Sequence, residues 1–363
     1  MRQELTRLCE QIKEASNAGG RLYITAGQTK DFYGEPRDPD HGAQPLDMAA
    51  YTGVISYEPS ELVIKARAGT PLAEIESVLE RHGQMLAFEP PRFGHTSTLG
   101  GCISSGLAGP RRMAVGGVHD FVLGARIIDT TGQVLSFGGE VMKNVAGYDV
   151  SRLVAGSLGS LGPAAELSVK VAPKPAAETT VCLSVTHEQA LERCNQWRSQ
   201  PLPITATAHV DQTMYVRLSG SQAAITSTIN TIVADADHVT LEPDEAASFW
   251  DSMRDQTNAF FEQRPLWRIA VPPATPALDF GRTLTEWHGA LRWVSTTLPA
   301  HEVREMVAAV GGHATLFRYD GTAGTPVFHP LSPVLETINR RMMAQFDPQG
   351  LFQPGRLLPQ QQG

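Results

Sequence analysis

The sequence has few cysteines, no clustered charge and no long apolar run, and each shortage excludes a class of protein. Its four cysteines, Cys9, Cys102, Cys182 and Cys194, lack the C-x2-C spacing of zinc and iron–sulfur sites. We therefore expect reduced thiols and no metal site. The formal net charge is -8, without a block of lysines and arginines. Nucleic-acid binding is not expected, because neutralising phosphates requires clustered positive charge.

Membrane insertion and export are not expected either. No apolar run approaches the roughly 18 residues that a membrane-spanning helix needs. The first residues, MRQELTRLCEQIKEA, are polar where a secretory signal would be apolar. Hydrophobic residues nevertheless make up 42% of the chain and charged residues 19%, which favours a packed core over disorder. These features predict a folded cytoplasmic protein without a transmembrane segment.

The apolar pattern predicts an α+β protein with two domains. Residues 3–18 carry a helical stripe, and a short strand follows at 21–24. The sequence Ala-Pro-Lys-Pro at 172–175 breaks the chain, so we expect a first domain over 1–175. Alternating or continuous apolar runs predict further strands in that domain, at 53–57, 61–68 and 165–171, and a hairpin over 121–136.

The second domain, expected over 176–325, changes to alternating strands and helices. A β-α-β-β-α order over 179–234, with Trp267–Val271 as a closing strand, is typical of a ferredoxin-like sandwich with an antiparallel sheet. A looser set follows, with a helix at 277–287, a strand at 291–295 and a helix at 301–310.

A last helix and a tail make up residues 326–363. Ser332 is a good N-cap with Pro333 at the first helical position, and Asp347-Pro348 ends the helix. Its apolar stripe consists of Val334, Ile338, Met342 and Phe346.

Glycine provides the strongest functional signal, with 33 residues concentrated between Gly94 and Gly162. Three segments combine glycine with hydroxyl side chains: A-G-Q-T-K at 26–30, G-H-T-S-T-L-G-G-C-I-S-S-G at 94–106, and G-S-L-G-S-L-G at 156–162. Glycines let backbone N–H groups approach an anion, and hydroxyls donate hydrogen bonds without adding charge. Neither the G-x-G-x-x-G nor the G-x-x-x-x-G-K-[ST] motif is present. Each segment alone could be a tight surface loop, but together they predict a site for a phosphate-bearing cofactor.

The order of these segments resembles the FAD-binding domain of the vanillyl-alcohol oxidase, or PCMH-type, flavoprotein family. The tail F-D-P-Q-G-L-F-Q-P-G-R at 346–356 is similar to that family's closing F-D-P-x-x-x-F-N-P-G-[KR] signature, with Gln353 in place of the usual Asn. Within the family, M-K-N-V-A-G-Y-D-V-S-R-L at 142–153 and G-P-R-R at 109–112 resemble the FAD-binding E subunits of the glycolate oxidases, also called glycolate dehydrogenases. The resemblance implies a PCMH-type FAD-binding domain, a second, ferredoxin-like α+β cap domain, and a tail that returns to the FAD domain.

The resemblance also implies which residues bind FAD. The first loop would cradle the pyrophosphate, the second would assist it, and the third would lie beside the adenine. The first loop holds Gln28, Thr29 and Lys30 where many relatives attach FAD through a histidine, so we expect non-covalent FAD. The implied set is Ala26, Gly27, Gln28, Thr29, Lys30, Pro91, Gly94, Thr98, Leu99, Gly100, Gly101, Ser104, Ser105, Gly147, Tyr148, Asp149, Gly159, Gly162 and Arg356.

The catalytic residues are less defined. Lys143 could place a positive charge beside the flavin, or lie on the surface before a turn. Arg356 could bind a substrate carboxylate, or form a structural ion pair. His313 stands where relatives begin a G-H-x-G-D-x-N-x-H signature, but the Asp, the Asn and the second His are missing. That loss argues against independent oxidation of a hydroxy acid.

Three functions remain open at this point. The first is the FAD-binding subunit of a multi-subunit glycolate oxidase, which oxidises glycolate, a 2-hydroxy acid, to glyoxylate. Its implied partners are a larger, catalytic FAD subunit and an iron–sulfur subunit that receives electrons, in a complex that could lie at the periphery of the inner membrane. The second is a non-catalytic subunit that holds FAD. The third is a stand-alone NADPH-dependent flavin reductase of the enolpyruvyl-glucosamine type.

Overall fold

The computed structural model describes residues 2–37, 42–139, 149–233, 236–321 and 324–359, and the chain forms two compact units. The first unit contains residues 1–107, 117–173 and 330–363, and the second contains residues 108–116 and 174–329. The chain thus passes between units at 173/174 and 329/330, near the breaks read from the sequence. It also makes a short excursion into the second unit at 108–116.

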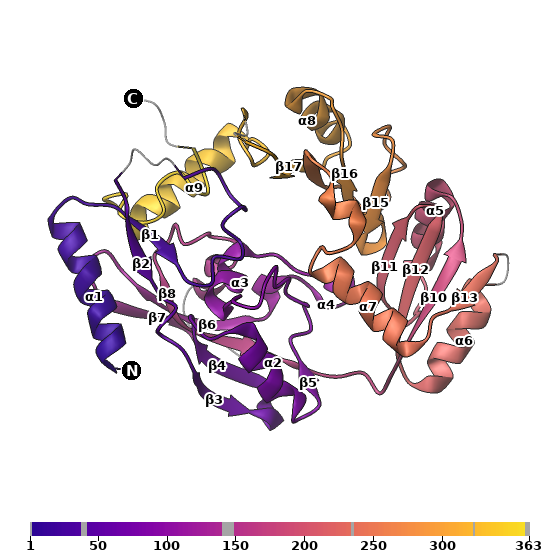
Figure 1. The fold of residues 1–363 in the computed structure, drawn as a ribbon, viewed down its shortest axis with the longest axis horizontal. Coiled ribbons are helices and arrows are strands. Elements are labelled where there is room, and N and C mark those ends of the chain that lie inside the picture. Colours follow the sequence, from indigo (N-terminus) through magenta and orange to yellow (C-terminus); the bar gives the residue numbers. More distant parts are fainter. Residues whose placement is uncertain (1, 38–41, 140–148, 234–235, 322–323, 360–363) are drawn as a thin grey trace. The chain divides into compact units, whose positions relative to one another are not determined.

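An antiparallel sheet of five strands forms the centre of the first unit (Figure 1). Its strand order is β3 (Val54–Glu58), β4 (Val63–Arg67), β8 (Ala164–Lys170), β6 (Val122–Ile128), β7 (Val134–Gly138). The central strand β8 is buried from Ala164 to Val169, which explains its apolar and small residues. The hairpin of β6 and β7 turns at Asp129, whose carboxylate accepts the N–H groups of Thr131 and Gln133, both at 2.9 Å. The strands expected from the sequence in this domain are confirmed.

The N-terminal and C-terminal segments share one core in this unit. Leu8 and Ile12 of α1 are fully buried, and they pack in one cluster with Leu22, Leu351 and Phe352. The remaining elements of the unit are α1 (Arg2–Asn17), the parallel pair β1 (Leu22–Thr25) and β2 (Gln44–Asp47), α2 (Leu72–Glu80), the pair β5 (Gln84–Met85) and β9 (Ala172–Pro173), α3 (Leu99–Ser105), α9 (Pro333–Phe346), and the 3-10 turns η2 (Pro59–Glu61), η3 (Val118–Asp120) and η4 (Ser151–Val154).

Helix α9 forms where the sequence predicts it, but much of its apolar stripe is exposed. The Ser332 hydroxyl accepts the Leu335 N–H at 3.4 Å, which confirms the N-cap. Phe346 is half-buried and meets Phe137 edge to face, with ring centroids 6.2 Å apart. Val334 is 68% exposed and Ile338 55% exposed. Helical periodicity therefore identified the helix but not the burial of its face.

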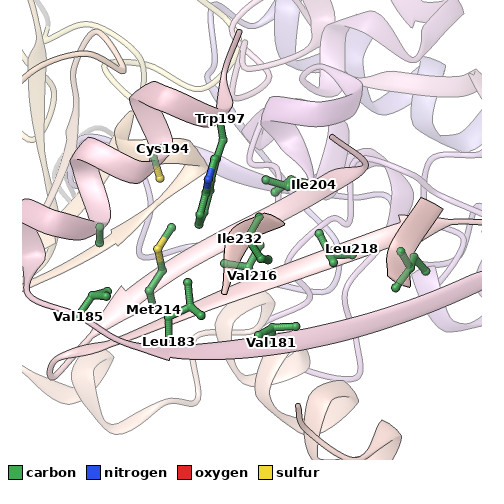
Figure 2. Close-up of a cluster of buried hydrophobic side chains, with 12 residues drawn as sticks. Val181, Leu183, Val185, Cys194, Trp197, Ile204, Met214, Val216, Leu218 and Ile232 are labelled. Atoms are coloured by element: carbon green, nitrogen blue, oxygen red, sulfur yellow. The ribbon is translucent and has the colours of Figure 1, made fainter. Parts of the chain in front are cut away.

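The second unit contains an eight-stranded antiparallel sheet. Its strand order is β13 (His238–Thr240), β10 (Ala177–Ser184), β12 (Thr213–Gly220), β11 (Ile204–Val210), β15 (Thr283–Glu286), β16 (Leu291–Val294), β14 (Leu266–Ala270), β17 (His313–Arg318). Its first half is a ferredoxin-like unit formed by β10 (Ala177–Ser184), α5 (His187–Trp197), β11 (Ile204–Val210), β12 (Thr213–Gly220), α6 (Gln222–Ile232) and β13 (His238–Thr240). Figure 2 shows its core, in which Val181, Leu183 and Val216 from the sheet face Cys194 and Trp197 of α5. The expected ferredoxin-like cap domain is confirmed in this half.

Two sequence-based expectations for the second unit were wrong. The closing strand is β13, three exposed residues without an apolar pattern, whereas Trp267–Val271 contributes β14 between β16 and β17. Residues 277–287 form no helix: Thr283–Glu286 is the buried strand β15, and Trp287 and His288 have left-handed backbone angles. The other elements of this half are α7 (Pro243–Arg254), η5 (Ala259–Glu262), β14 (Leu266–Ala270), η6 (Trp287–Gly289), β16 (Leu291–Val294), α8 (Ala300–Ala308) and β17 (His313–Arg318).

The excursion at 108–116, with its short helix α4 (Arg112–Val115), is anchored by buried contacts within the second unit. Arg111 is buried and forms a 2.7 Å ion pair with Glu178. The Trp287 indole N–H donates to the Gly109 carbonyl at 3.0 Å, and the Arg112 guanidinium lies 4.9 Å from the centre of the Trp287 ring. The G-P-R-R motif at 109–112 therefore has a structural role in this unit.

Candidate cofactor-binding site

A cleft opens in the first unit, between the loop after β1, helix α3 and the C-terminal tail. Its walls come from widely separated segments of the chain: Ile24, Thr25, Ala26, Gly27, Gln28, Thr29, Lys30, Asp31, Tyr33, Arg37, Met48, Ala68, Thr98, Gly100, Gly101, Ser104, Ser105, Leu158, Gly159, Pro163, Ala164, Gln353 and Arg356. Twelve of the residues predicted to bind the cofactor are among them.

The loop after β1 lines the cleft and contains successive backbone N–H groups without an acceptor among the described residues. In the described part of the chain, no acceptor receives the N–H groups of Gly27, Gln28 or Thr29. Gln28 adopts a left-handed conformation with φ of 57°. Successive N–H groups around a left-handed residue form a concave nest that binds anions. This geometry fits a phosphate group, as the sequence predicted for this loop.

Gly27 is required by the packing of the loop against residues 96 and 97. A Cβ built on Gly27 would lie 1.7 Å from the Thr96 carbonyl oxygen, so no other residue fits. The Thr96 hydroxyl donates to the Gly27 carbonyl at 2.7 Å and fixes the same contact. The shape of the nest therefore depends on the second glycine-rich segment.

Lys30 supplies positive charge at the end of the nest. Its Nζ donates to the Ser97 hydroxyl at 2.7 Å and to the Arg92 carbonyl at 3.3 Å, and it lies 5.6 Å from the centre of the Phe93 ring. These three partners are neutral groups. An anion in the nest would be stabilised by this charge.

Helix α3 contributes contact surface to the cleft, whereas the backbone N–H groups of its two glycines bind within the protein. The Gly100 N–H donates to the Ala68 carbonyl at 2.7 Å, and the Gly101 N–H is 3.3 Å from the Thr98 hydroxyl. A Cβ on Gly100 would lie 2.8 Å from the Ala68 Cβ, so close packing requires this glycine. The N–H groups of both glycines are used within the protein, so these residues contribute contact surface to the cleft.

Hydroxyl groups further along α3 reach the same cleft. Ser104 and Ser105 both line it, and the Ser105 hydroxyl donates to the Cys102 carbonyl at 2.9 Å. Leu99 is fully buried beneath the helix, and its N–H donates to the Thr70 carbonyl at 2.9 Å. Burial raises the pKa of the Cys102 thiol to about 12, which makes it a packing residue with no thiolate at neutral pH.

Arg356 lines the cleft but is bound by the protein itself. The side chain is buried, and its guanidinium donates to the carbonyls of Asp31 at 3.0 Å, Tyr33 at 2.6 Å and Glu35. Three carbonyl partners around one guanidinium hold the 31–35 loop in place. This arrangement favours the structural interpretation of Arg356 over a role in binding substrate.

Several predicted residues do not line the cleft. Gly94 lies beside the first loop, where its Cβ would be 3.0 Å from Thr29 Cγ2. Pro91 is buried, and Gly162 packs against the Ile128 carbonyl. Asp149 forms a 3.0 Å ion pair with Arg152. Three further candidates, Lys143, Gly147 and Tyr148, lie outside the described residues.

His313 belongs to the second unit, at the first position of β17. His313 is an exposed residue, and partial desolvation of its ring, with the nearby charges of Arg268, His329 and Arg112, lowers its pKa. His329 accepts the Ala314 N–H at 3.3 Å through its Nδ1. Within the described residues, no group of three or more His, Cys, Asp and Glu side chains could hold a metal ion.

Thr25 and Gln353 were not among the cofactor-binding residues predicted from the sequence. Both line the cleft, both are 8% exposed, and Thr25 Oγ1 and Gln353 Oε1 have no hydrogen-bond partner among the described residues. Buried polar atoms without a hydrogen-bond partner are uncommon in folded proteins, and a bound ligand or water can supply the missing partner. Gln353 was already distinctive in the sequence, because it replaces the Asn that is usual in the family's closing signature.

Comparison with known proteins identifies the family. Residues 5–138 match the FAD binding domain family. Across 352 residues, 96% of each chain, the sequence is 41% identical to glycolate oxidase subunit GlcE of Escherichia coli strain K12. The chain belongs to the GlcE family. Glycolate oxidase subunit GlcD of Bacillus subtilis strain 168 is 29% identical over 143 residues, which cover 39% of this chain and 30% of GlcD.

Solved structures agree with the fold of this GlcE-family chain. Substrate-bound p-cresol methylhydroxylase matches with a TM-score of 0.69 at 13% identity, over 97% of this chain and 87% of the other. An alkyldihydroxyacetonephosphate synthase structure matches with a TM-score of 0.67 at 13% identity, over 95% and 74% of the two chains. The expected PCMH-type fold with a second α+β domain is therefore confirmed.

The cleft has the chemistry that FAD requires. The nest at Gly27–Thr29 and the Lys30 charge fit a pyrophosphate, and the unpartnered Thr25 and Gln353 oxygens fit a ligand rich in hydrogen-bond donors. FAD carries both kinds of group. The domain that matches the FAD-binding family thus also contains a cleft suited to FAD.

Proposed function

We propose that this chain is the FAD-binding subunit of a multi-subunit glycolate oxidase that converts glycolate to glyoxylate. The observation that carries the proposal is the 41% identity to GlcE over 96% of both chains. The oxidation removes two electrons and two protons from the CH–OH group of the hydroxy acid. FAD, when bound, supplies the two-electron acceptor for this reaction.

The residues of the first unit bind and orient the cofactor in this proposal. Gly27, Gln28 and Thr29 donate backbone hydrogen bonds to the pyrophosphate, and Lys30 offsets its charge. Arg356 holds the adjoining 31–35 loop through carbonyl groups. A pre-formed cleft of this kind binds its ligand with little loss of conformational freedom.

Partner subunits complete the enzyme. The GlcD and GlcE names of the relatives indicate a multi-subunit enzyme, and a larger FAD subunit is the proposed site of hydroxy-acid oxidation. An iron–sulfur subunit is the proposed electron acceptor. The four cysteines of this chain are free and widely spaced, which supports placing the cluster in a partner.

We place the complex in the cytoplasm, at the periphery of the inner membrane. No helix in the described ranges is long and apolar enough to cross a bilayer. Contact with a membrane acceptor is therefore assigned to the partners. Fractionation of cells that express the tagged chain, with and without the partner genes, tests this placement.

Co-expression tests the function. The chain purified alone should bind FAD but show little glycolate-dependent dye reduction, and activity should appear when the larger FAD subunit and the iron–sulfur subunit are co-expressed. The matched experiment uses the same complex carrying Gly101→Val in this chain, which should lower FAD content and activity together.

Two outcomes would support other functions. Full activity of a complex whose GlcE-family subunit lacks FAD would indicate that this subunit has no catalytic role. Bleaching of the isolated flavoprotein by NADPH would indicate a stand-alone reductase. Glycolate turnover by the isolated chain, at the rate of the complex, would contradict the need for partners.

A further inference from the structure

The cleft contains two buried side-chain oxygens that have no hydrogen-bond partner in the described part of the chain. Thr25 lies at the end of β1 and Gln353 in the C-terminal tail, and each side chain is 8% exposed. Among the described residues, neither Thr25 Oγ1 nor Gln353 Oε1 forms a hydrogen bond. Both residues line the cleft. A buried oxygen without a partner is costly, so a bound ligand that supplies one gains affinity.

The backbone of the C-terminal tail holds Gln353 beside β1. Leu22 and Phe352 form a parallel bridge, the Leu22 N–H donates to the Leu351 carbonyl at 2.7 Å, and the Gln353 N–H donates to the Leu22 carbonyl at 2.9 Å. The Gln353 backbone then turns away with φ of 44°. Its side-chain Nε2 continues the ladder by donating to the Ile24 carbonyl at 3.2 Å. Because Nε2 is used there, Oε1 is the atom that remains for a ligand.

Asp347 fixes the turn that brings the tail to this position. Its carboxylate accepts the N–H groups of Leu351 at 2.8 Å and Phe352 at 2.7 Å. Both of those side chains are buried in the core of the first unit. The Asp and the second Phe of the F-D-P-x-x-x-F signature therefore position the residue that follows them.

Gly159 leaves room for the Gln353 side chain. A Cβ at Gly159 would lie 2.8 Å from Ile24 Cδ1 and 3.2 Å from Gln353 Cγ, and the backbone φ is 80°. The third glycine-rich segment thus accommodates Gln353. An Asn at position 353 would be one methylene shorter, so its side-chain amide would lie farther from the Ile24 carbonyl.

We propose that Gln353 and Thr25 are direct hydrogen-bond partners of the bound FAD. Gln353 accepts a hydrogen bond through Oε1 from a hydroxyl or N–H group of the cofactor. The Thr25 hydroxyl forms a hydrogen bond with a polar group of the same cofactor. The inference rests on the proposed FAD-dependent function. Both halves of FAD carry suitable donors: ribose hydroxyls and the adenine amino group in the ADP half, and ribityl hydroxyls and the ring N–H in the FMN half.

The test uses the full chain as apoprotein and three variants. Gln353→Met and Thr25→Val keep the volume of the side chain but remove its hydrogen bond, whereas Gln349→Met changes an exposed glutamine of the same tail. FAD affinity is measured by fluorescence titration, and ADP and FMN are measured as competitors. Thermal unfolding of each apoprotein reports its fold.

Each cleft variant should bind FAD about 3- to 10-fold more weakly, as expected for one neutral hydrogen bond. For each variant, the loss of affinity should also be seen with either ADP or FMN but not with both, which identifies the half of FAD that the residue binds. Gln349→Met should bind FAD with wild-type affinity. Unchanged FAD affinity in both cleft variants would overturn the inference. Equal losses for ADP and FMN would also overturn it, because they indicate a distorted cleft. Failure of the wild-type apoprotein to bind FAD would overturn the proposed function as well.

Discussion

Replacement of Gly101 by alanine should raise the stability of the apoprotein and lower its affinity for FAD. Gly101 lies within α3 and has no positive φ, so alanine fits its backbone. Apart from its chain neighbours and the backbone of its own helix, the described residues place one heavy atom within 4 Å of a Cβ built there, the Thr98 hydroxyl oxygen at 3.3 Å, which would have to shift by a few tenths of an ångström. Glycine inside a helix costs about 0.5–1 kcal/mol relative to alanine. A domain of this size should therefore unfold roughly 1–4 °C higher in Gly101→Ala.

The same methyl group enters the cleft that Gly101 lines. Overpacking costs about 1–3 kcal/mol, so FAD should bind roughly 5- to 150-fold more weakly. Gly101→Val should lose more, with an apoprotein that stays folded by circular dichroism. Backbone strain adds nothing to this loss, because Gly101 is helical and has no positive φ.

Gly100→Ala is the matched control. Its Cβ would lie 2.8 Å from the Ala68 Cβ, so the apoprotein itself should lose stability. Differential scanning fluorimetry of the apoproteins and fluorescence titration with FAD measure the two quantities separately. FAD affinity that is unchanged in both Gly101→Ala and Gly101→Val would refute the placement of the cofactor against α3.

Three further predictions concern the cofactor, a buried arginine and acid stability. Because the first loop contains no histidine, acid precipitation should release the yellow chromophore, and a flavin that stays with the polypeptide would contradict non-covalent binding. Arg356→Lys should increase proteolysis of the 31–35 loop and weaken FAD binding, because one ammonium group cannot replace three guanidinium hydrogen bonds. A raised KM for the substrate with unchanged protein stability would instead indicate a substrate-binding arginine. Burial, with the charges of His209 and Arg292, lowers the pKa of His187 to about 4, whereas the unfolded chain takes up this proton near pH 6.5. The free energy of unfolding should therefore fall by on the order of 2–3 kcal/mol as the pH drops from 6.5 to 4. Urea titrations of His187→Gln should show a smaller fall than those of the wild-type chain. An equal fall in both proteins would refute the lowered pKa of His187.

Local sequence was sufficient wherever one short segment determines its own structure. The loop at Ala26–Lys30 and the hairpin turn at Asp129 were predicted because glycine, hydroxyl and Asx chemistry act within a few residues. Apolar periodicity was sufficient for the five strands of the central sheet in the first unit and for α9. It was insufficient for β13, whose three residues are all exposed.

Tertiary structure decided which atoms of the predicted segments are available to a ligand. Gly100 belongs to the predicted glycine-rich segment, yet its N–H is taken by Ala68, more than 30 residues earlier in the chain. Thr25 and Gln353 meet in one cleft because the tail pairs with β1, a contact between the two ends of the sequence. Sequence patterns specify residue chemistry and local conformation, whereas hydrogen-bond partners and burial depend on which distant segments the fold brings together. The sequence by itself therefore determined the family and the cofactor class, and only the folded chain decided which donors and acceptors face the cofactor.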